Sequence, residues 1–270
     1  SINSTEISEE QNTIDDKEIL SYIMSSAVEL DLVGIYSSGY IYTGLANSLG
    51  QTNWHSNYSF SFDYSIYNKN NNAIKLNYSS KEWNNDEYDL ILEKGIEKLA
   101  ILSVPQKTID TGEYTVYLEP SALNEIIDMM SWGGFSYKSN KIGTSPLHLL
   151  NKKEKSLHRY VSIDENIKDG ISANFNSDGF IKPDVINMIS EGKFADTLVS
   201  PRSSLEYSVK HNASSMSEYP CSVDMRAGDI KNDQILNTVN NGIYISNLWY
   251  LNFSDRNNGR MTGLTRFGCF

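Results

Sequence analysis

The sequence is poor in features that define whole classes of protein. Among its 270 residues there are only two cysteines, Cys221 and Cys269, which lie far apart and form no CxxC pair. A disulfide-stabilised secreted scaffold is therefore not expected, and a reducing compartment such as the cytoplasm is the simpler interpretation. No apolar run reaches the length of a membrane span and no signal peptide is visible at the start, so we expect no membrane association.

Basic residues are also scarce. The chain has 23 Lys and Arg residues against 34 Asp and Glu residues, which gives a formal net charge of −11 at pH 7. A protein that binds nucleic acid directly needs a stripe of positive charge to neutralise phosphates, and the sequence contains no block of Lys or Arg. We therefore expect no direct binding to nucleic acid, and the acidic balance indicates solubility.

Several catalytic motifs are missing as well. The chain has no GxSxG, no GxxxxGK[ST] and no GxGxxG after a strand, and none of its four histidines forms an HExxH motif. His148 and His158 flank a charged turn and would make a weak metal pair, although two unrelated surface histidines are the simpler interpretation. Cys221 would need a base such as His211 to act as a nucleophile, and a small buried cysteine is the simpler alternative.

The sequence does contain strongly patterned sheet. Its 17 tyrosines suit a half-buried sheet surface. Residues 58–67 alternate between apolar and polar side chains, and residues 73–80 resume the alternation after an Asn-rich turn, which predicts a hairpin. Helices are expected from Asp15 or Asp16 and over residues 85–103. Because helices and strands mix without regular βαβ alternation, we expect an α+β fold, rich in antiparallel sheet with a few flanking helices.

The stretch YTVYLEPSALNEIIDMM, residues 114–130, predicts a buried strand that runs into a helix. Strand-to-helix junctions often carry chemistry. Glu125 and Asp128 lie on the polar face of this helix and are candidates for acid–base work or for holding a cation, although a solvated helix face is the more ordinary interpretation. The core-facing stripe consists of Leu123, Ile126, Ile127 and Met130.

Residues 242–270 predict two long strands joined by a polar turn, after a short helix expected behind Ser200. This stretch places polar residues next to aromatic ones, namely Asn247, Trp249, Tyr250 and Asn252. Such a hairpin would suit an extended peptide, bound by edge-strand addition or by side-chain amide contacts. A hairpin with one polar face is the simpler interpretation.

These motifs resemble the TldD/PmbA family, whose members are known as modulators of DNA gyrase or as microcin-processing peptidases. GIYISNLWYLNFSDRNNGRMTGLTRFGCF is similar to the family's C-terminal signature, and TLVSPRSSLEYSVKHNAS resembles its Ser-Pro-Arg segment with the following Asn. GEYTVYLEPSAL resembles the strand that opens the C-terminal half, and NSLGQTNWHSNYSFSFDYSIY resembles the end of the N-terminal half. The resemblance covers nearly all of the chain after residue 16.

The resemblance also implies a domain organisation. We expect a flexible lead over residues 1–15, the end of an N-terminal α+β domain over residues 16–108, and a β-rich C-terminal domain over residues 109–270 that is barrel- or sandwich-like and incomplete at its end. Family members normally begin with a further α/β segment and continue into a few more strands, so the chain resembles an incomplete copy at both ends.

The family implies a cytoplasmic peptidase system in which TldD-type subunits carry an HExxxH zinc helix. PmbA-type subunits lack this motif and pair with the zinc subunit. Placing Glu125 on the Glu of the motif puts Asn124 and Met129 at the two His positions, and neither is an ordinary zinc ligand. No HExxxH occurs anywhere in the chain. We therefore expect no metal or other cofactor here, and zinc in a partner subunit.

The expected function is that of a zinc-free, PmbA-type subunit of a proteolytic complex that binds unfolded peptide beside a TldD-like subunit or a second copy of itself. The alternatives are a self-sufficient metallopeptidase with a non-standard site and a non-catalytic regulatory or interaction protein. Weak catalytic candidates are Glu125, His211 and Cys221. The candidates for contact with the peptide are Ser200, Arg202, Asn212, Asn247, Trp249, Tyr250, Asn252 and Arg266.

Overall fold

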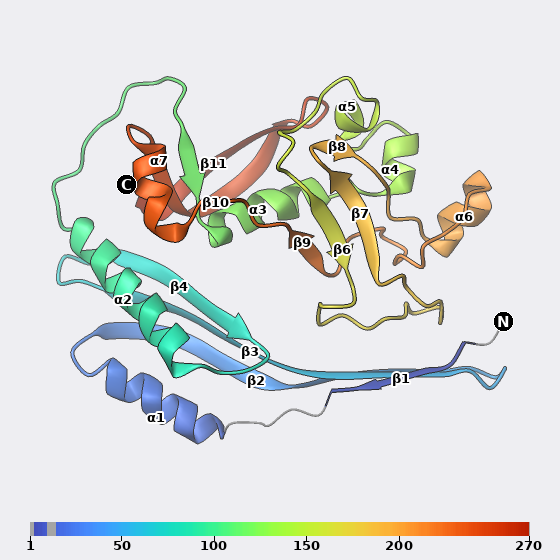
Figure 1. Cartoon of the computed structure of the whole chain (residues 1–270), viewed down its shortest axis with the longest axis horizontal. Coiled ribbons are helices and arrows are strands. Elements are labelled where there is room, and N and C mark those ends of the chain that lie inside the picture. The colour runs from blue at the N-terminus through green and yellow to red at the C-terminus, as the bar shows by residue number, and fades with distance from the viewer. Residues whose placement is uncertain (1–2, 10–14, 270) are drawn as a thin grey trace.

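The computed structural model describes residues 3–9 and 15–269, with side chains up to residue 265, and consists of two sheet-containing halves (Figure 1). The first half is a four-stranded sheet with two helices against one face. Its elements are β1 (Thr5–Ser8), α1 (Asp16–Ser26), β2 (Asp31–Ala46), β3 (Thr52–Tyr67), β4 (Ala73–Ser80) and α2 (Asn85–Ile101).

The first sheet is built on β3. This strand pairs antiparallel with β2 along its full length and with β4 along its second half, and parallel with β1 at its beginning. The predicted hairpin of residues 58–67 and 73–80 is thereby confirmed. Among the described strands β2 pairs with β3 alone, so β2 forms one edge of the sheet.

Strand β1 departs from the sequence-based expectation. Residues 1–15 were expected to form a flexible lead, but Thr5–Ser8 within them pair with Asn53–Ser56 of β3. Ile7 is the one apolar residue of this strand. A pattern of alternating burial is therefore absent, and backbone pairing of this kind leaves little trace in a sequence.

The first core lies between β3, β4 and the two helices. Because side chains of a strand alternate between its faces, Phe60, Phe62, Tyr64 and Ile66 all point to the helical side, and each is buried. Ile19 and Ile23 reach this core from α1. Tyr88, Leu92 and Leu99 reach it from α2.

Both helices begin where the sequence predicts. The Asp15 carboxylate accepts a hydrogen bond of 2.9 Å from the Lys17 N–H and caps α1. The Asn84 side chain accepts one of 3.2 Å from the Glu87 N–H and caps α2. Side-chain oxygens at this position satisfy backbone N–H groups that have no partner inside the helix.

The second half contains two further open sheets with strand orders β11-β10-β5 and β8-β7-β6-β9. The described residues thus form an α+β fold, as expected, and their strands close into no barrel. The strands are β5 (Val116–Leu118), β6 (Ile163–Asn166), β7 (Val185–Ser190), β8 (Lys193–Phe194), β9 (Val223–Met225), β10 (Ile243–Asp255) and β11 (Arg260–Cys269). The helices are α3 (Pro120–Ser131), α4 (Tyr137–Lys141), α5 (His148–Asn151), α6 (Pro201–Tyr207), a 3-10 turn (Asn232–Gln234) and α7 (Ile235–Val239).

The second half buries a hydrophobic core that includes Phe135 and Met188, and it also buries the carboxylate of Glu218, which is 2% exposed. This carboxylate accepts hydrogen bonds from the Ser136 hydroxyl at 2.6 Å and from the N–H groups of Lys138 and Ser200, both at 2.9 Å. Burial alone would raise the pKa of Glu218. The hydrogen bonds from Ser136, Ser200, Ser203 and Lys138 outweigh it, and the net pKa is lowered from its ordinary 4.5.

The packing of β3 generates a first prediction. Replacing the fully buried Ile66 by Ala should lower the free energy of unfolding by about 2–5 kcal/mol, because the change removes buried methyl groups and leaves a cavity. The matched control is Ile35→Ala on β2, whose side chain is 75% exposed, and there the loss should stay below about 1 kcal/mol. Urea denaturation followed by circular dichroism measures both. Equal losses would contradict the burial pattern.

Glu218 generates a second prediction. Glu218→Gln should lower the free energy of unfolding by about 2–3 kcal/mol at pH 7, because charged acceptors make stronger hydrogen bonds than amides. The folded pKa lies below 4.5, so this contribution is complete above about pH 4.5 and is lost as pH falls through the folded pKa. The difference between the two proteins should therefore shrink in acid.

The matched control for Glu218 is Glu206→Gln. The Glu206 carboxylate lies 3.9 Å from the Lys138 ammonium group, and its side chain is 43% exposed. An exposed pair of this kind contributes little, so the change should cost less than about 1 kcal/mol. Urea titrations at a series of pH values decide the matter, and a pH-independent Glu218 effect would contradict the prediction.

Candidate functional site

The strand-to-helix junction of residues 114–130 is tied to the first half of the molecule. Glu119 stands at the start of α3 without capping it, because its carboxylate is turned toward the Lys98 ammonium group and the Tyr244 hydroxyl. The Lys98 and Glu119 side chains are only 19% and 17% exposed. Burial, followed by the hydrogen bond and charge of Glu119, raises the pKa of Tyr244, so its hydroxyl stays a neutral donor. A cavity of about 390 Å³ opens beside this cluster, between α2 and α7.

The three motif positions assigned on α3 do not come together. Asn124 and Glu125 are exposed, whereas the Met129 side chain is buried at 3% exposure. Residues five apart on a continuous helix point about 140° away from each other, and α3 is continuous from Pro120 to Ser131. An amide, a carboxylate and a buried thioether in this arrangement do not fit zinc, which takes a compact tetrahedron of His, Cys or carboxylate groups.

The five-residue spacing of the two HExxxH histidines could also bring ligands together where the helix ends and the chain turns. Asp128 and Gly133 have this spacing at the end of α3, which stops at Ser131, and Gly133 takes a left-handed φ of 79°. Gly133 offers no ligand, and the Asp128 carboxylate accepts a hydrogen bond from the Tyr219 hydroxyl. Burial, followed by the hydrogen bond to Asp128, raises the pKa of Tyr219 to about 12. This register therefore supplies no zinc-binding set either.

The structure does not pair Cys221 with His211. The His211 ring packs against Phe180 at 4.6 Å, and its Nδ1 accepts a hydrogen bond of 3.2 Å from the Ala213 N–H. Cys221 is an exposed residue, contrary to the expected buried cysteine, and its N–H donates to the buried Glu165 carboxylate at 2.8 Å. Desolvation raises the pKa of the Cys221 thiol; Lys182 lowers it and Glu165 raises it, with a net increase. A protonated thiol is a poor nucleophile.

His148 and His158 make separate local contacts. The His148 Nδ1 lies 3.1 Å from the Ser145 carbonyl oxygen, and the His158 Nδ1 accepts a hydrogen bond of 3.3 Å from the Tyr160 N–H. Over residues 3–9 and 15–265, no group of three or more His, Cys, Asp and Glu side chains is placed to hold a metal ion.

Two of the predicted peptide-contacting residues support backbone. The Ser200 hydroxyl accepts a hydrogen bond from the Ser203 N–H and caps α6, as the sequence predicts. The Asn212 amide accepts from the Val199 N–H at 2.8 Å and donates to the Thr197 carbonyl at 2.7 Å. Arg202 is exposed on the same helix. Ser200 and Asn212 thus fix the segment that presents Arg202 to solvent.

The C-terminal hairpin presents the remaining candidates. β10 and β11 pair antiparallel with register shifts, one of which falls between Trp249 and Asn252. Tyr250 lies within one shift at a φ of 50°, and its side chain is 77% exposed. The Trp249 ring packs edge-on against it at 5.3 Å. Asn247 lies earlier on β10, opposite Arg266, whose side chain is outside the described residues.

Arg256 anchors the turn of this hairpin to the end of α3. Its guanidinium group donates to the Trp132 carbonyl and, at 3.0 Å, to the Thr144 carbonyl, and it lies 5.1 Å from the Phe253 ring centre. The hairpin and α3 therefore form one continuous surface. Sequence reasoning missed this role of Arg256, as it missed Glu218 and Glu165, because each acts on backbone groups far away in the chain.

One comparison with known proteins identifies a family. Residues 111–270 match the model of the PmbA/TldA metallopeptidase C-terminal domain. No curated protein matches the chain. Within the described residues, no helix is both long and apolar enough to cross a membrane.

Three solved structures share the fold. They are a candidate modulator of a DNA gyrase from Thermotoga maritima (17% identity, TM-score 0.69), one from Bacteroides thetaiotaomicron (16%, 0.65) and TldE from Thermococcus kodakarensis (13%, 0.71). They cover 90%, 93% and 97% of this chain, which in turn spans 62%, 62% and 66% of theirs. Because the family model matches well over half of the chain, the protein belongs to the TldD/PmbA family.

Proposed function

We propose that this chain is the zinc-free subunit of a TldD/PmbA-type peptidase assembly and that it binds unfolded peptide for a zinc-bearing partner subunit. Its C-terminal half carries the family's metallopeptidase domain. The observation that carries the proposal is the helix α3, where Asn124, Glu125 and Met129 supply no ligand set for zinc. A TldD-like subunit or a second copy of this chain would complete the assembly.

The exposed part of the second half supports peptide binding. Trp249 and Tyr250 project aromatic surface, and Arg202 adds a cation that is exposed on α6. Aromatic and arginine side chains contribute most of the energy at protein interfaces. An unfolded peptide offers the matching groups, namely apolar side chains and backbone carbonyls.

The same proposal places the protein in the cytoplasm, where the family's peptidase system would work. Exposed Cys221 has no disulfide partner among the side chains that the structure describes, which suits a reducing compartment. A net charge of −11 is unfavourable for contact with DNA. Any connection with a gyrase would therefore run through proteolysis of a protein partner.

Metal content tests the zinc-free assignment. The isolated chain, purified and dialysed against micromolar zinc, should retain far less than one zinc ion per chain, because α3 offers no suitable ligands. Zinc should become stoichiometric only in a complex with a TldD-like partner. Inductively coupled plasma mass spectrometry measures both. Stoichiometric zinc in the isolated chain would refute the assignment.

Peptide binding tests the role of the hairpin. Tyr250→Ala should weaken binding of fluorescein-labelled, reduced and carboxymethylated α-lactalbumin about tenfold, which corresponds to about 1.4 kcal/mol. The matched control is Tyr160→Ala, where a tyrosine of 59% exposure lies outside the candidate surface. Fluorescence anisotropy gives the dissociation constants. Equal affinities of the two variants would exclude the hairpin as the binding surface.

A further inference from the structure

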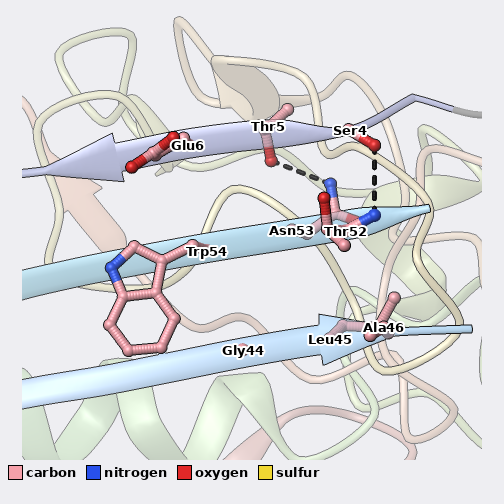
Figure 2. A pocket seen from close by; sticks show the side chains of 9 residues that line it. All are labelled: Ser4, Thr5, Glu6, Gly44, Leu45, Ala46, Thr52, Asn53 and Trp54. Atoms are coloured by element: carbon pink, nitrogen blue, oxygen red, sulfur yellow. Dashed lines mark hydrogen bonds between the residues drawn. The ribbon is translucent and has the colours of Figure 1, made fainter. Parts of the chain in front are cut away.

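The short strand β1 is held to β3 mainly by polar contacts. The Asn53 amide donates to the Asn3 carbonyl at 2.9 Å. It also donates to the Thr5 hydroxyl at 2.9 Å, and the Thr52 N–H donates to the Ser4 hydroxyl at 3.1 Å (Figure 2). At the other end of the segment, the Glu9 N–H donates to the Ser56 carbonyl at 3.2 Å. The segment 3–9 thus lies along β3 as an extended peptide would.

The segment buries little apolar surface. Ile7, its one apolar residue, is 37% exposed, and Ser4, Glu6 and Ser8 are exposed as well. Segments with few buried apolar contacts open with a small free-energy cost. Opening would leave the edge of β3 unpaired over Asn53–Ser56, and an unpaired edge with its row of N–H and C=O groups is a template for another strand.

Beside this edge, β3 makes polar side-chain contacts to the β1 segment on one face and leaves an aromatic side chain partly uncovered on the other. Asn53 and Gln51 are buried, and their amides point at the backbone of residue 3. On the opposite face of β3, the Trp54 indole is 41% exposed and stacks on Tyr42 at 5.7 Å.

In the β1 register Trp54 lies opposite Glu6, a charged residue that covers the indole poorly. The ring lies against Gly44 of β2, where an added Cβ would come within 3.3 Å of it. An open cleft of about 590 Å³ is bounded by these three strands (Figure 2).

We propose that the edge of β3 over Asn53–Ser56 is a binding groove for an extended peptide, which β1 occupies in cis as a replaceable ligand. The groove selects a Ser or Thr whose hydroxyl meets the Asn53 amide, followed by a bulky apolar residue that covers Trp54. Edge-strand addition supplies affinity through the main chain, and alternate side chains supply specificity. This inference takes only its ligand class from the proposed function, because the groove lies in the first half of the molecule, away from the C-terminal hairpin.

The test uses the full chain and two fluorescein-labelled peptides. NSTEISE copies residues 3–9, and NSTFISE replaces the residue equivalent to Glu6 by Phe. In the parent chain, β1 competes with the added peptide for the edge of β3, and because β1 is part of the same chain its effective concentration is high. Glu9→Pro removes the N–H that bonds Ser56 and the carboxylate that accepts from the Lys81 ammonium group at 2.9 and 3.1 Å, and it should release the segment. Both peptides should then bind at least about tenfold more tightly than to the parent chain.

Three further variants locate the binding. Glu6→Pro is the matched control, because residues three apart in a strand turn their N–H groups to opposite edges, and it should leave affinity unchanged. Asn53→Ala in the Glu9→Pro background should weaken both peptides at least about fivefold. Trp54→Ala in that background should abolish the preference for NSTFISE, which should otherwise bind about fivefold more tightly than NSTEISE.

Hydrogen exchange of the Thr5 and Ile7 N–H groups, which face β3 as the Glu9 N–H does, accompanies each titration. Fast exchange in Glu9→Pro without a gain in peptide affinity would overturn the proposal, and so would exchange that stays slow, because β1 would then not be replaceable. Tyr250→Ala in the Glu9→Pro background should leave the gain in affinity for both heptapeptides unchanged, because that gain arises at the edge of β3. Failure of the hairpin to bind unfolded protein is thereby distinguished from failure of this groove.

Discussion

The first half of the molecule depends on the pairing of β3, a strand that meets different partners at its two ends. Along its second half β3 lies between β2 and β4 and buries Phe60, Phe62, Tyr64 and Ile66 beneath the two helices. Along its first half one face carries buried polar side chains instead, and these reach other segments. The Asn57 amide donates to the Ile171 carbonyl, and the amide of Gln51, one residue before β3, donates to the Gly179 carbonyl at 2.7 Å. One strand thus builds a core and fixes the second half against it.

The second half relies on buried acceptors more than on regular strands. Glu218 and Glu165 each take backbone N–H groups that their own segments leave without partners. Buried carboxylates are tolerated only when several donors satisfy them. The loops that carry Ser200 and Asn212 therefore hold their shape without long sheets, and they present α6 and the C-terminal hairpin on a stable support.

Much of the fold could be predicted from local sequence, whereas the connections between segments could not. Asp15 and Ser200 predict helix starts because a capping side chain bonds a backbone N–H within three residues of itself. The alternation of apolar and polar residues predicts β3 and β4 because one face of each strand is buried. Glu218 carries no such signal, since its donors Ser200, Lys138 and Ser136 lie 18, 80 and 82 residues away along the chain. β1 has no alternation to detect. Ser200 and Asn212 are polar residues in loops, and from the sequence such residues can either contact a substrate or support the backbone. Residue type alone does not distinguish these two roles.

The edge strand β2 carries a consequence for the behaviour of the protein in solution. Its sixteen residues contain one charge, at Asp31, and no proline, and Val33 and Ile35 are 62% and 75% exposed. Edge strands are ordinarily protected from self-association by charged side chains, prolines or bulges. Resistance to self-association therefore depends on repulsion between molecules that each carry a net charge of −11. This repulsion is screened over roughly 8 Å at physiological ionic strength. Salt would weaken that repulsion and leave the exposed edge unchanged.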